Sequence, residues 1–296
     1  MDLSNILGNM AEKAKEAAAV SEDDYTGEDG LLYCGKCHTR KQTRIQIFGR
    51  EDIVYCLCKC QAEARDAEEA ERQRRRRMER INEMRQAGFP DAEMQNWTFE
   101  RDDQSNEQIS KTARKYVEHF EEMKKRGQGL LFFGDVGTGK TFISACIANA
   151  LIDKGFPCMV TNFARLVNTL SGMYEGKQEF IDNLNNFDLL VIDDLASERD
   201  TEYMGEIVQN IIDSRYRAGL PLIITTNLTS EELKRPLEIR KKRIYSRLLE
   251  MCIPIEVKGK DRRRQKLREE FNEIGNLLGL DVAERINKAK NEDKTL

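Results

Sequence analysis

The stretch GLLFFGDVGTGKT, residues 129–141, joins a short apolar run to a glycine-rich loop. Its last part, residues 134–141, fits the pattern G-x-x-x-x-G-K-[ST], in which backbone N–H groups surround phosphate oxygens. Gly137 and Gly139 permit this turn without Cβ clashes, and a helix beginning near Lys140 adds the partial positive charge of its N-terminus. The stretch therefore predicts a phosphate-binding loop between a strand and a helix. The alternative is a glycine-rich turn that binds no ligand.

The same pattern assigns roles to individual side chains of the loop. Lys140 is expected to reach the β- and γ-phosphates of a nucleotide, and the Thr141 hydroxyl is expected to bind Mg²⁺. The residues expected to hold the nucleotide are Gly134, Asp135, Val136, Gly137, Thr138, Gly139, Lys140 and Thr141.

The surrounding sequence alternates between strand-like and helix-like segments. Strands are predicted at 129–134, 156–162, 187–195, 220–227 and 252–259, and helices at 141–154, 163–175 and 201–218, with one more before the last strand. Strands that alternate with helices of this length are connected by right-handed crossovers. The alternation therefore predicts an α/β fold whose five-stranded parallel sheet lies between helices.

A second decisive stretch is FDLLVIDDL, residues 187–195, an apolar run that ends in two adjacent aspartates. Such a run is typical of a strand buried on both faces of a parallel sheet, where paired carboxylates are costly without a cation. We expect this strand to lie beside the strand at 129–134, so that Asp193 ends next to Thr141 and helps to hold Mg²⁺ through a water. Asp194 would then face the γ-phosphate and orient or deprotonate the attacking water. The alternative is a pair of aspartates that cap the next helix.

Two later segments are candidates for the same site. IITTN ends the fourth strand with Asn227, which could sense the γ-phosphate or position the water; the alternative is an ordinary asparagine at a strand end. In RIYSRLLEMC, Arg243 and Arg247 lie four residues apart on one helical face, with no acidic residue on that face before Glu250. Arginines in this position can act on the nucleotide of a neighbouring subunit. The alternative is a solvated basic helix.

Composition limits the class of protein. The 296 residues are 40% hydrophobic and 34% charged, with a formal charge of −4, which excludes a globally basic protein that coats DNA. No segment has the roughly 20 apolar residues that would cross a bilayer, and the N-terminus does not resemble a signal peptide. We therefore expect a soluble cytoplasmic protein without membrane association.

Five of the eight cysteines lie between positions 34 and 60, in YCGKC and YCLCKC. A C-x2-C pair followed about 20 residues later by C-x-C predicts a four-thiolate zinc site, since clustered thiols in a reducing compartment are typically metal ligands. The alternating residues between the pairs predict a hairpin that brings them together. The expected ligands are Cys34, Cys37, Cys58 and Cys60, with Cys56 as the alternative ligand. Free buried thiols are the competing interpretation.

These patterns divide the chain into five parts. They are an N-terminal helical segment (1–33), a zinc module (34–60), a charged linker helix (61–88), a nucleotide-binding domain (89–259) and a basic C-terminal helix or tail (260–296). The basic run KGKDRRRQKLR at 258–268, together with residues 240–243, could form a local groove for single-stranded DNA.

The phosphate loop, LLVIDD, IITTN and RIYSRL, in this order and at these spacings, resemble the AAA+ family of P-loop ATPases. Within it, residues 89–260 are similar to replicative helicase loaders of the DnaC and DnaI type, and the sister family of IstB-like transposition helper ATPases shares most of these features. By this resemblance Lys140 and Thr141 match the Walker A pair, Asp193 the Walker B metal ligand, Asp194 the catalytic glutamate, Asn227 sensor 1, and Arg247 the arginine finger with Arg243 as its companion. The resemblance also implies that Trp97 and Phe99 pack against adenine.

The chain departs from the family pattern in two places. Asp194 is one methylene shorter than the usual glutamate, so it implies slow hydrolysis or leaves the role of base to Glu198. About 39 residues follow Val257, too few for the usual helical lid, and helicase loaders also lack that lid.

The resemblance implies an ATP-dependent DNA replication protein that loads the replicative helicase and uses slow ATP hydrolysis as an assembly switch. It would bind ATP, Mg²⁺ and Zn²⁺, contact the helicase through residues 1–88, and self-associate through the ATP site. The alternatives are an IstB-like transposition helper, which assembles on duplex DNA and recruits a transposase, and an ATP-binding module without hydrolysis.

Overall fold

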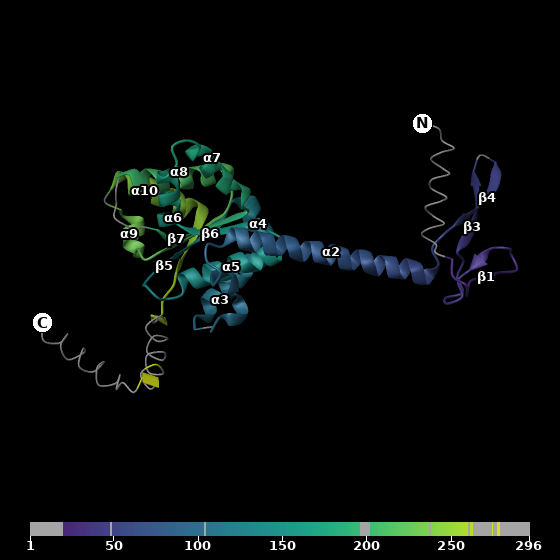
Figure 1. Cartoon of the computed structure of the whole chain (residues 1–296). Helices are drawn as coiled ribbons and strands as arrows, with labels where there is room; N and C mark the ends of the chain where they lie inside the picture. Colours follow the sequence, from purple (N-terminus) through teal and green to yellow (C-terminus); the bar gives the residue numbers. More distant parts are fainter. Residues whose placement is uncertain are drawn as a thin grey trace. The chain divides into compact units, whose positions relative to one another are not determined.

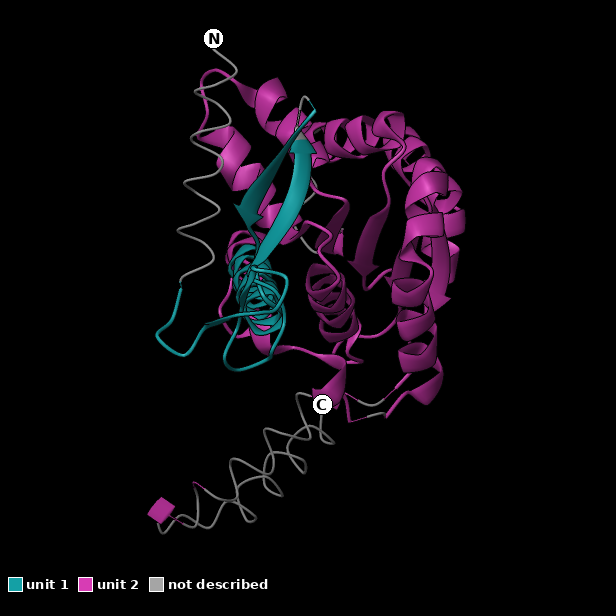
Figure 2. Cartoon of the chain, turned by 90° about the vertical axis from the view of Figure 1, so that its right-hand side faces the viewer, with its two compact units in different colours: residues 1–80 teal, residues 81–296 magenta. Residues whose placement is uncertain are grey.

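The computed structural model of this chain describes residues 20–47, 49–103, 105–195, 202–236, 238–259, 261–262, 274 and 277–278. The chain divides into two compact units, residues 1–80 and 81–296, coloured separately in Figure 2.

The larger unit is built on a five-stranded sheet in which all paired strands run parallel. Its strands are β5 (Gly129–Phe133), β6 (Cys158–Asn162), β7 (Leu189–Leu195), β8 (Leu222–Thr226) and β9 (Cys252–Glu256). Each lies inside a segment predicted to be a strand, which confirms the α/β class.

The order of the strands is β6-β7-β8-β5-β9, so one adjacency predicted from the sequence is wrong. Strands β5 and β7 do not lie side by side, because β8 lies between them and pairs with both through Ile223, which is opposite Leu130 and Val191. All three strands end at the same edge, so side chains at their carboxyl ends can still meet across β8.

Alternate side chains of each strand enter two hydrophobic cores, one on each face of the sheet. Leu130 and Phe132 pack with residues of α3 (Glu107–Glu118) and α5 (Lys140–Asp153), whereas Leu131 packs against the opposite set of helices. That set includes α6 (Phe163–Ser171), α8 (Glu202–Ala218) and α10 (Ile239–Met251), so helices cover both faces (Figure 1). The fold is therefore a three-layer sandwich, as predicted.

Shorter elements complete this unit. They are α4 (Phe120–Arg126), α7 (Lys177–Asn183), α9 (Ser230–Lys234) and the 3₁₀ turns η1 (Met94–Asn96), η2 (Phe99–Arg101) and η3 (Leu184–Asn186). The helix predicted at 163–175 ends earlier, at Ser171, because Gly172 follows it and glycine has low helix propensity.

The smaller unit contains two antiparallel pairs of strands. Strand β1 (Tyr25–Thr26) pairs with β2 (Leu32–Tyr33), and β3 (Gln42–Ile47) pairs with β4 (Arg50–Tyr55) as the predicted hairpin. The prediction of a helical segment over 1–33 is wrong for residues 20–33, where β1 and β2 lie; residues 1–19 are outside the described part. A buried ion pair between Lys41 and Asp24 ties this segment to the start of the hairpin.

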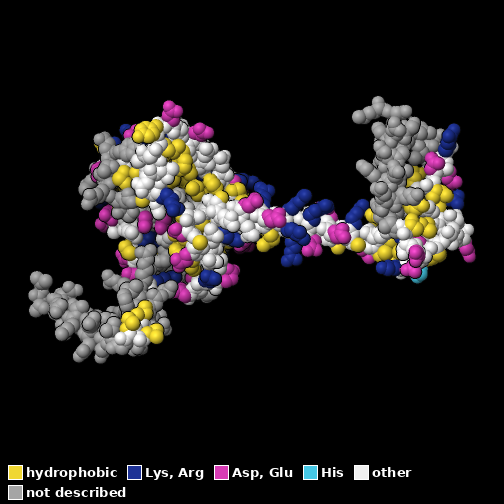
Figure 3. Space-filling view, viewed as in Figure 1, with side chains coloured by type: hydrophobic (Ala, Val, Ile, Leu, Met, Phe, Trp, Pro, Cys, Tyr) yellow, Lys and Arg dark blue, Asp and Glu magenta, His cyan; other side chains and the backbone are white. Residues whose placement is uncertain are grey.

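Helix α2 (Lys59–Gly88) covers the segment predicted as a charged helix. Lys, Arg, Asp and Glu side chains alternate along its surface (Figure 3) and form i,i+4 pairs such as Lys59 with Glu63 and Arg75 with Glu71. Its last residues, 81–88, belong to the larger unit, where Ile81 enters the hydrophobic core. Of the helices that the structure describes, none has the length and apolar character needed to cross a membrane.

Candidate functional site

The glycine-rich loop lies where the sequence predicts it, between the end of β5 and the start of α5. Gly137 and Gly139 have φ angles of 78° and 94°, a left-handed conformation that side chains with a Cβ rarely adopt. Each is also closely packed, because a Cβ on Gly137 would collide with Asp261 and a Cβ on Gly139 would lie 3.2 Å from the guanidinium carbon of Arg262. The loop therefore requires glycine at both positions.

The lysine of the loop is buried and oriented by the loop itself. Lys140 Nζ donates hydrogen bonds to the backbone oxygens of Gly134, at 2.9 Å, and Asp135, at 2.7 Å. Because these acceptors hold the ammonium group inside the loop, its charge is in place before a phosphate arrives.

Three elements contribute to a cluster of oxygen ligands beside this lysine. The Thr141 hydroxyl, in the first turn of α5, lies 2.9 and 3.0 Å from the two carboxylate oxygens of Asp193, near the end of β7. Thr225, on the intervening strand β8, also donates to Asp193. Burial raises the pKa of Asp193, so a cation beside this carboxylate would stabilise its charged form. Hydroxyl and carboxylate oxygens are donors that Mg²⁺ prefers.

Asp194 is turned away from Asp193 by an irregularity of the strand. The pairing of β7 with β8 shifts register between Ile192 and Leu195, and Asp194 adopts a φ of 57°. Its backbone N–H donates to Thr225 Oγ1 at 3.0 Å. A bulge of this kind redirects a side chain, and here the redirected carboxylate lines a cavity.

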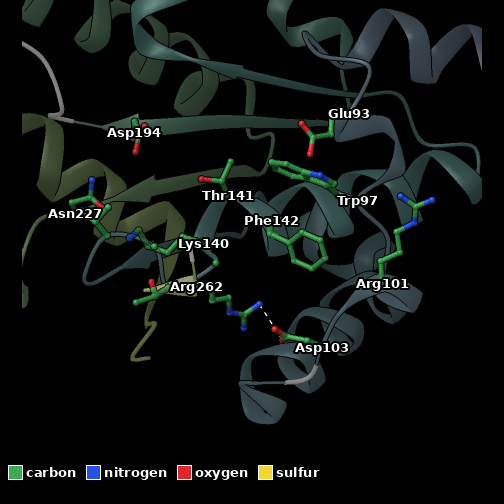
Figure 4. A pocket seen from close by; sticks show the side chains of 14 residues that line it. Glu93, Trp97, Arg101, Asp103, Lys140, Thr141, Phe142, Asp194, Asn227 and Arg262 are labelled. Carbon is green, nitrogen blue, oxygen red and sulfur yellow. Dashed lines mark ion pairs between the residues drawn. The ribbon is translucent and has the colours of Figure 1, made fainter. Parts of the chain in front are cut away.

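This cavity has a volume of about 450 Å³ and lies over the glycine-rich loop. Figure 4 shows Trp97 and Phe142 on one side and Asp194 and Asn227 on the other, with Lys140 and Thr141 between them. The complete lining is Glu93, Trp97, Arg101, Asp103, Val136, Gly137, Thr138, Gly139, Lys140, Thr141, Phe142, Asp194, Asn227 and Arg262. The cavity therefore joins an end with two aromatic side chains, which also carries Glu93 and Arg101, to an end with Lys140, Asp194 and Asn227.

The two aromatic residues proposed for adenine have different positions. Trp97 lines the cavity and packs against Phe142, with ring centroids 5.8 Å apart. Phe99 is 6% exposed and belongs to the hydrophobic core, under the guanidinium of Arg114. The expectation for Phe99 is wrong, since Phe99 begins the 3₁₀ turn η2 and its side chain is buried there.

The two arginines of α10 lie away from this cavity. Arg247 forms an ion pair with Asp213 of α8 and lies over the ring of Tyr216, so an acidic residue from another helix faces the surface that the sequence suggested was purely basic. Arg243 lines a second cavity, of about 620 Å³, between α8 and α10. Neither arginine lines the cavity over the glycine-rich loop. Glu198, the alternative base, lies outside the described residues.

In the smaller unit, four cysteine sulfurs converge. The Sγ atoms of Cys34, Cys37, Cys58 and Cys60 all lie within 4.8 Å of one another. The Cys34–Cys60 and Cys58–Cys60 distances are 3.7 and 3.3 Å, and four sulfurs bound to one zinc at about 2.3 Å would lie about 3.8 Å apart. Cys56 is not part of the cluster, and its thiol points toward the backbone oxygen of Arg40.

The charges of the four thiols depend on one another. A hydrogen bond with Thr39 lowers the pKa of Cys37 to about 5, whereas the hydrogen bond with Cys58 raises the pKa of Cys60 to about 12. Four thiolates at these distances repel each other unless a cation lies between them. The donor set and its geometry therefore fit a tetrahedral zinc ion.

Comparison with known proteins identifies the family. The family described as IstB-like ATP binding protein matches residues 62–270, most of the chain. The chain belongs to the IstB-like ATP-binding family.

Similarity to individual proteins agrees with this assignment. The chain is 27% identical over 150 residues to the replicative helicase loader DnaI of Bacillus subtilis, covering 47% of this chain and 48% of the relative. It is 29% identical over 145 residues to the replicative helicase loader DnaC of Escherichia coli, covering 48% of this chain and 57% of that protein. The chain thus spans about half the length of the curated relatives it matches. A crystal structure of DnaI shares the fold, with a TM-score of 0.51 and 22% identity over 60% of this chain and 98% of that one.

Several residues of the site could not be recognised from the sequence. Glu93, Arg101 and Asp103 precede the glycine-rich loop by more than 30 residues and match no motif. Arg262 was expected in a DNA-binding run. The family match extends to residue 270, so the segment that carries Arg262 belongs to the part of the chain shared with the IstB-like family.

Asn149 is a further supporting residue that sequence reasoning missed. It is 1% exposed on α5, and its amide group donates to the backbone oxygens of Met94 and Trp97, both at 2.9 Å. Its side-chain oxygen accepts from Arg85 Nε at 3.1 Å. Asn149 therefore fixes the wall of the cavity that carries Trp97.

We predict that Asn149→Leu destabilises the larger unit. The two carbonyls would lose their partner, and each buried polar group left unpaired costs about 1–3 kcal/mol in the free energy of unfolding. Urea denaturation followed by the fluorescence of Trp97, the only tryptophan, measures this loss. The control is Asn168→Leu at an exposed position of α6. Equal stability of the two variants would contradict the role given to Asn149.

Proposed function

We propose that this chain is an ATP-dependent replicative helicase loader that binds ATP with Mg²⁺ and hydrolyses it slowly, as an assembly switch in the cytoplasm. The main support is that Lys140, Thr141 and Asp193 lie together at one edge of the sheet. A cavity of about 450 Å³ lies beside them. Two relatives are named replicative helicase loaders, DnaI and DnaC, and their similarity supports a role in loading the replicative helicase.

Each part of the cavity has a role in this proposal. Lys140 binds the β- and γ-phosphates, Thr141 and Asp193 hold Mg²⁺, and Trp97 packs against the base. Mg²⁺, when bound, neutralises charge that develops on the transferred phosphoryl group. Asp194 orients or deprotonates the attacking water, and Asn227 positions it. The side chain of Asp194 is shorter than that of a glutamate, which favours slow turnover.

In this proposal the smaller unit binds the partner protein. Its four cysteines hold one zinc ion, and the helicase binds through residues 1–88. The basic run after β9 is proposed to contact single-stranded DNA; residues 260 and 263–268 of this run lie outside the described part.

A second candidate function rests on the family description. The resemblance of the motifs also implies an IstB-like transposition helper, and the residues 62–270 that match the family described as IstB-like ATP binding protein do not include the cysteine cluster. The two functions are distinguished by adding the full-length protein to a purified replicative helicase and to duplex DNA. A loader forms an ATP-dependent complex with the helicase, whereas a transposition helper assembles on duplex DNA without it.

The nucleotide site itself is tested by Lys140→Ala. We expect ATP affinity to fall by about 10–100-fold, because one charge-assisted hydrogen bond is worth about 1.5–3 kcal/mol. Titration of Trp97 fluorescence with ATP measures the affinity, and circular dichroism verifies folding. The matched control is Lys111→Ala, which removes an exposed lysine that pairs with Glu107. Unchanged affinity in Lys140→Ala would contradict the assignment of the loop.

A further inference from the structure

The chain returns to the glycine-rich loop after its last strand. The Val257 backbone N–H donates to the Phe133 oxygen at 2.8 Å, next to the start of the loop. Asn106 Nδ2 donates to the Lys258 oxygen at 3.1 Å, and the Arg262 backbone N–H donates to the Gly137 oxygen at 3.0 Å. These three hydrogen bonds place the backbone of Arg262 directly on the phosphate-binding loop.

The side chain of Arg262 is held inside the nucleotide cavity. Its Nη1 atom lies 3.2 Å from Asp103 Oδ1, the ion pair drawn in Figure 4, and both residues line the cavity. The guanidinium also lies against Gly139, where a Cβ would be 3.3 Å from Nη1. Only 29% of the side chain is exposed, compared with 59% for Asp103.

This arrangement has a consequence for the charge of the cavity. A carboxylate at the mouth of a site for a polyanion opposes binding by Coulomb repulsion, and Arg262 offsets that charge in the nucleotide-free chain. A guanidinium binds phosphate oxygens at least as well as carboxylate oxygens, because its planar array of donors matches both. The Arg262 guanidinium therefore already lies at the loop in the nucleotide-free chain. Its partner there is the single carboxylate of Asp103, which is a weaker anion than the phosphates of a nucleotide.

We propose that Arg262 contacts the phosphates of the bound nucleotide, and that Asp103 and the nucleotide compete for its guanidinium. The inference rests on the proposed function, in which ATP occupies this cavity. It assigns to Arg262 a phosphate-binding role within the same chain and leaves the proposed contact with DNA to the other basic residues of the run.

The test compares full-length variants by ATP titration of Trp97 fluorescence. Arg262→Ala should lower ATP affinity about tenfold, the equivalent of one charge-assisted hydrogen bond, and Arg262→Lys should retain part of it. Asp103→Asn should raise the affinity several-fold, since it removes the competitor. In the double variant no guanidinium remains to compete for, so Asp103→Asn can act only by removing Coulomb repulsion, and its effect should be lost at high salt.

Competition experiments show which part of the nucleotide Arg262 binds. Inorganic tripolyphosphate should bind Arg262→Ala about tenfold more weakly than wild type, whereas adenosine should bind both equally. Arg126→Ala, an exposed arginine of α4 paired with Glu122, is the matched control. Thermal melting verifies that each variant is folded.

The outcomes separate this inference from the proposed function. Failure of wild type to bind ATP would contradict the proposed function itself. Normal ATP binding by wild type together with unchanged affinity in Arg262→Ala would overturn only the inference. The inference would also be overturned if Arg262→Ala weakened binding of single-stranded DNA but not of ATP, since Arg262 would then belong to the DNA-contacting run.

Discussion

Removal of zinc from the purified protein is expected to unfold the smaller unit and to leave ATP binding intact. Among the described residues of that unit, only Leu31, Cys34 and Cys58 are buried hydrophobic residues, too few to form a core. Zinc binding in small modules of this kind is worth about 10–16 kcal/mol, so the metal would supply the folding free energy that packing does not. Elemental analysis should find about one zinc per chain, and loss of protection in amide hydrogen exchange should follow chelation.

Two cysteine variants make this prediction specific. Cys34→Ser removes a member of the cluster and should abolish zinc binding and structure in residues 20–55. Cys56→Ser, the matched control, lies outside the cluster and should retain both. ATP titration of Trp97 fluorescence should be unchanged in either variant, because the nucleotide cavity belongs to the other unit. Protein purified without chelator and free of zinc would contradict the metal site.

Arg247→Ala is expected to lower ATP hydrolysis in assembled protein by roughly 10³–10⁵-fold, the range measured for arginine fingers. ATP affinity should stay near wild type, since the residues that line the nucleotide cavity do not include Arg247. In the isolated chain Arg247 is paired with Asp213, so it would exchange this partner for a neighbour's phosphates on assembly. Arg217→Ala, at an exposed position in the last turn of α8, is the control.

Mixing two inactive variants decides whether the arginine acts between subunits. Lys140→Ala provides an intact Arg247 to the intact nucleotide site of Arg247→Ala, so the mixture should recover part of the hydrolysis. An arginine that acts within its own chain predicts no recovery at any ratio. That result would leave ATP binding in place and would exclude assembly through the nucleotide site.

Local sequence patterns predicted much of the fold and the position of the candidate nucleotide site. The five strands and the glycine-rich loop were predictable because each is encoded by a contiguous pattern of apolar residues or glycines. The contact between Thr141 and Asp193 was also predicted, although the reason given for it was wrong. Strand β8 separates the two strands, yet the Thr141 hydroxyl reaches Asp193 directly, and Thr225 of β8 donates to the same carboxylate. Strand order is decided by how distant segments pack, which no local pattern records.

The remaining differences also arise from tertiary contacts. Asp213 faces Arg247 only because α8 packs against α10, and its sequence separation from Arg247 is too large for a helical-face argument. Arg262 lies in the cavity because Val257 pairs with Phe133 at the end of β5, Asn106 holds Lys258, and the Arg262 N–H donates to Gly137 of the loop. Phe99 and Trp97 are only two residues apart, yet a 3₁₀ turn sends one into the core and the other into the cavity.

The hydrogen bonds of Asn149 link helix α2 to the wall of the cavity that carries Trp97. A single side chain accepts a hydrogen bond from Arg85, on the last turn of α2, and donates to the segment that carries Trp97. We therefore expect a ligand that moves Arg85 to change the free energy of ordering the cavity wall. Linkage is reciprocal, so the factor by which such a ligand alters ATP affinity equals the factor by which ATP alters the affinity of that ligand. A binding partner of α2 and the nucleotide would in this way regulate each other through one amide group.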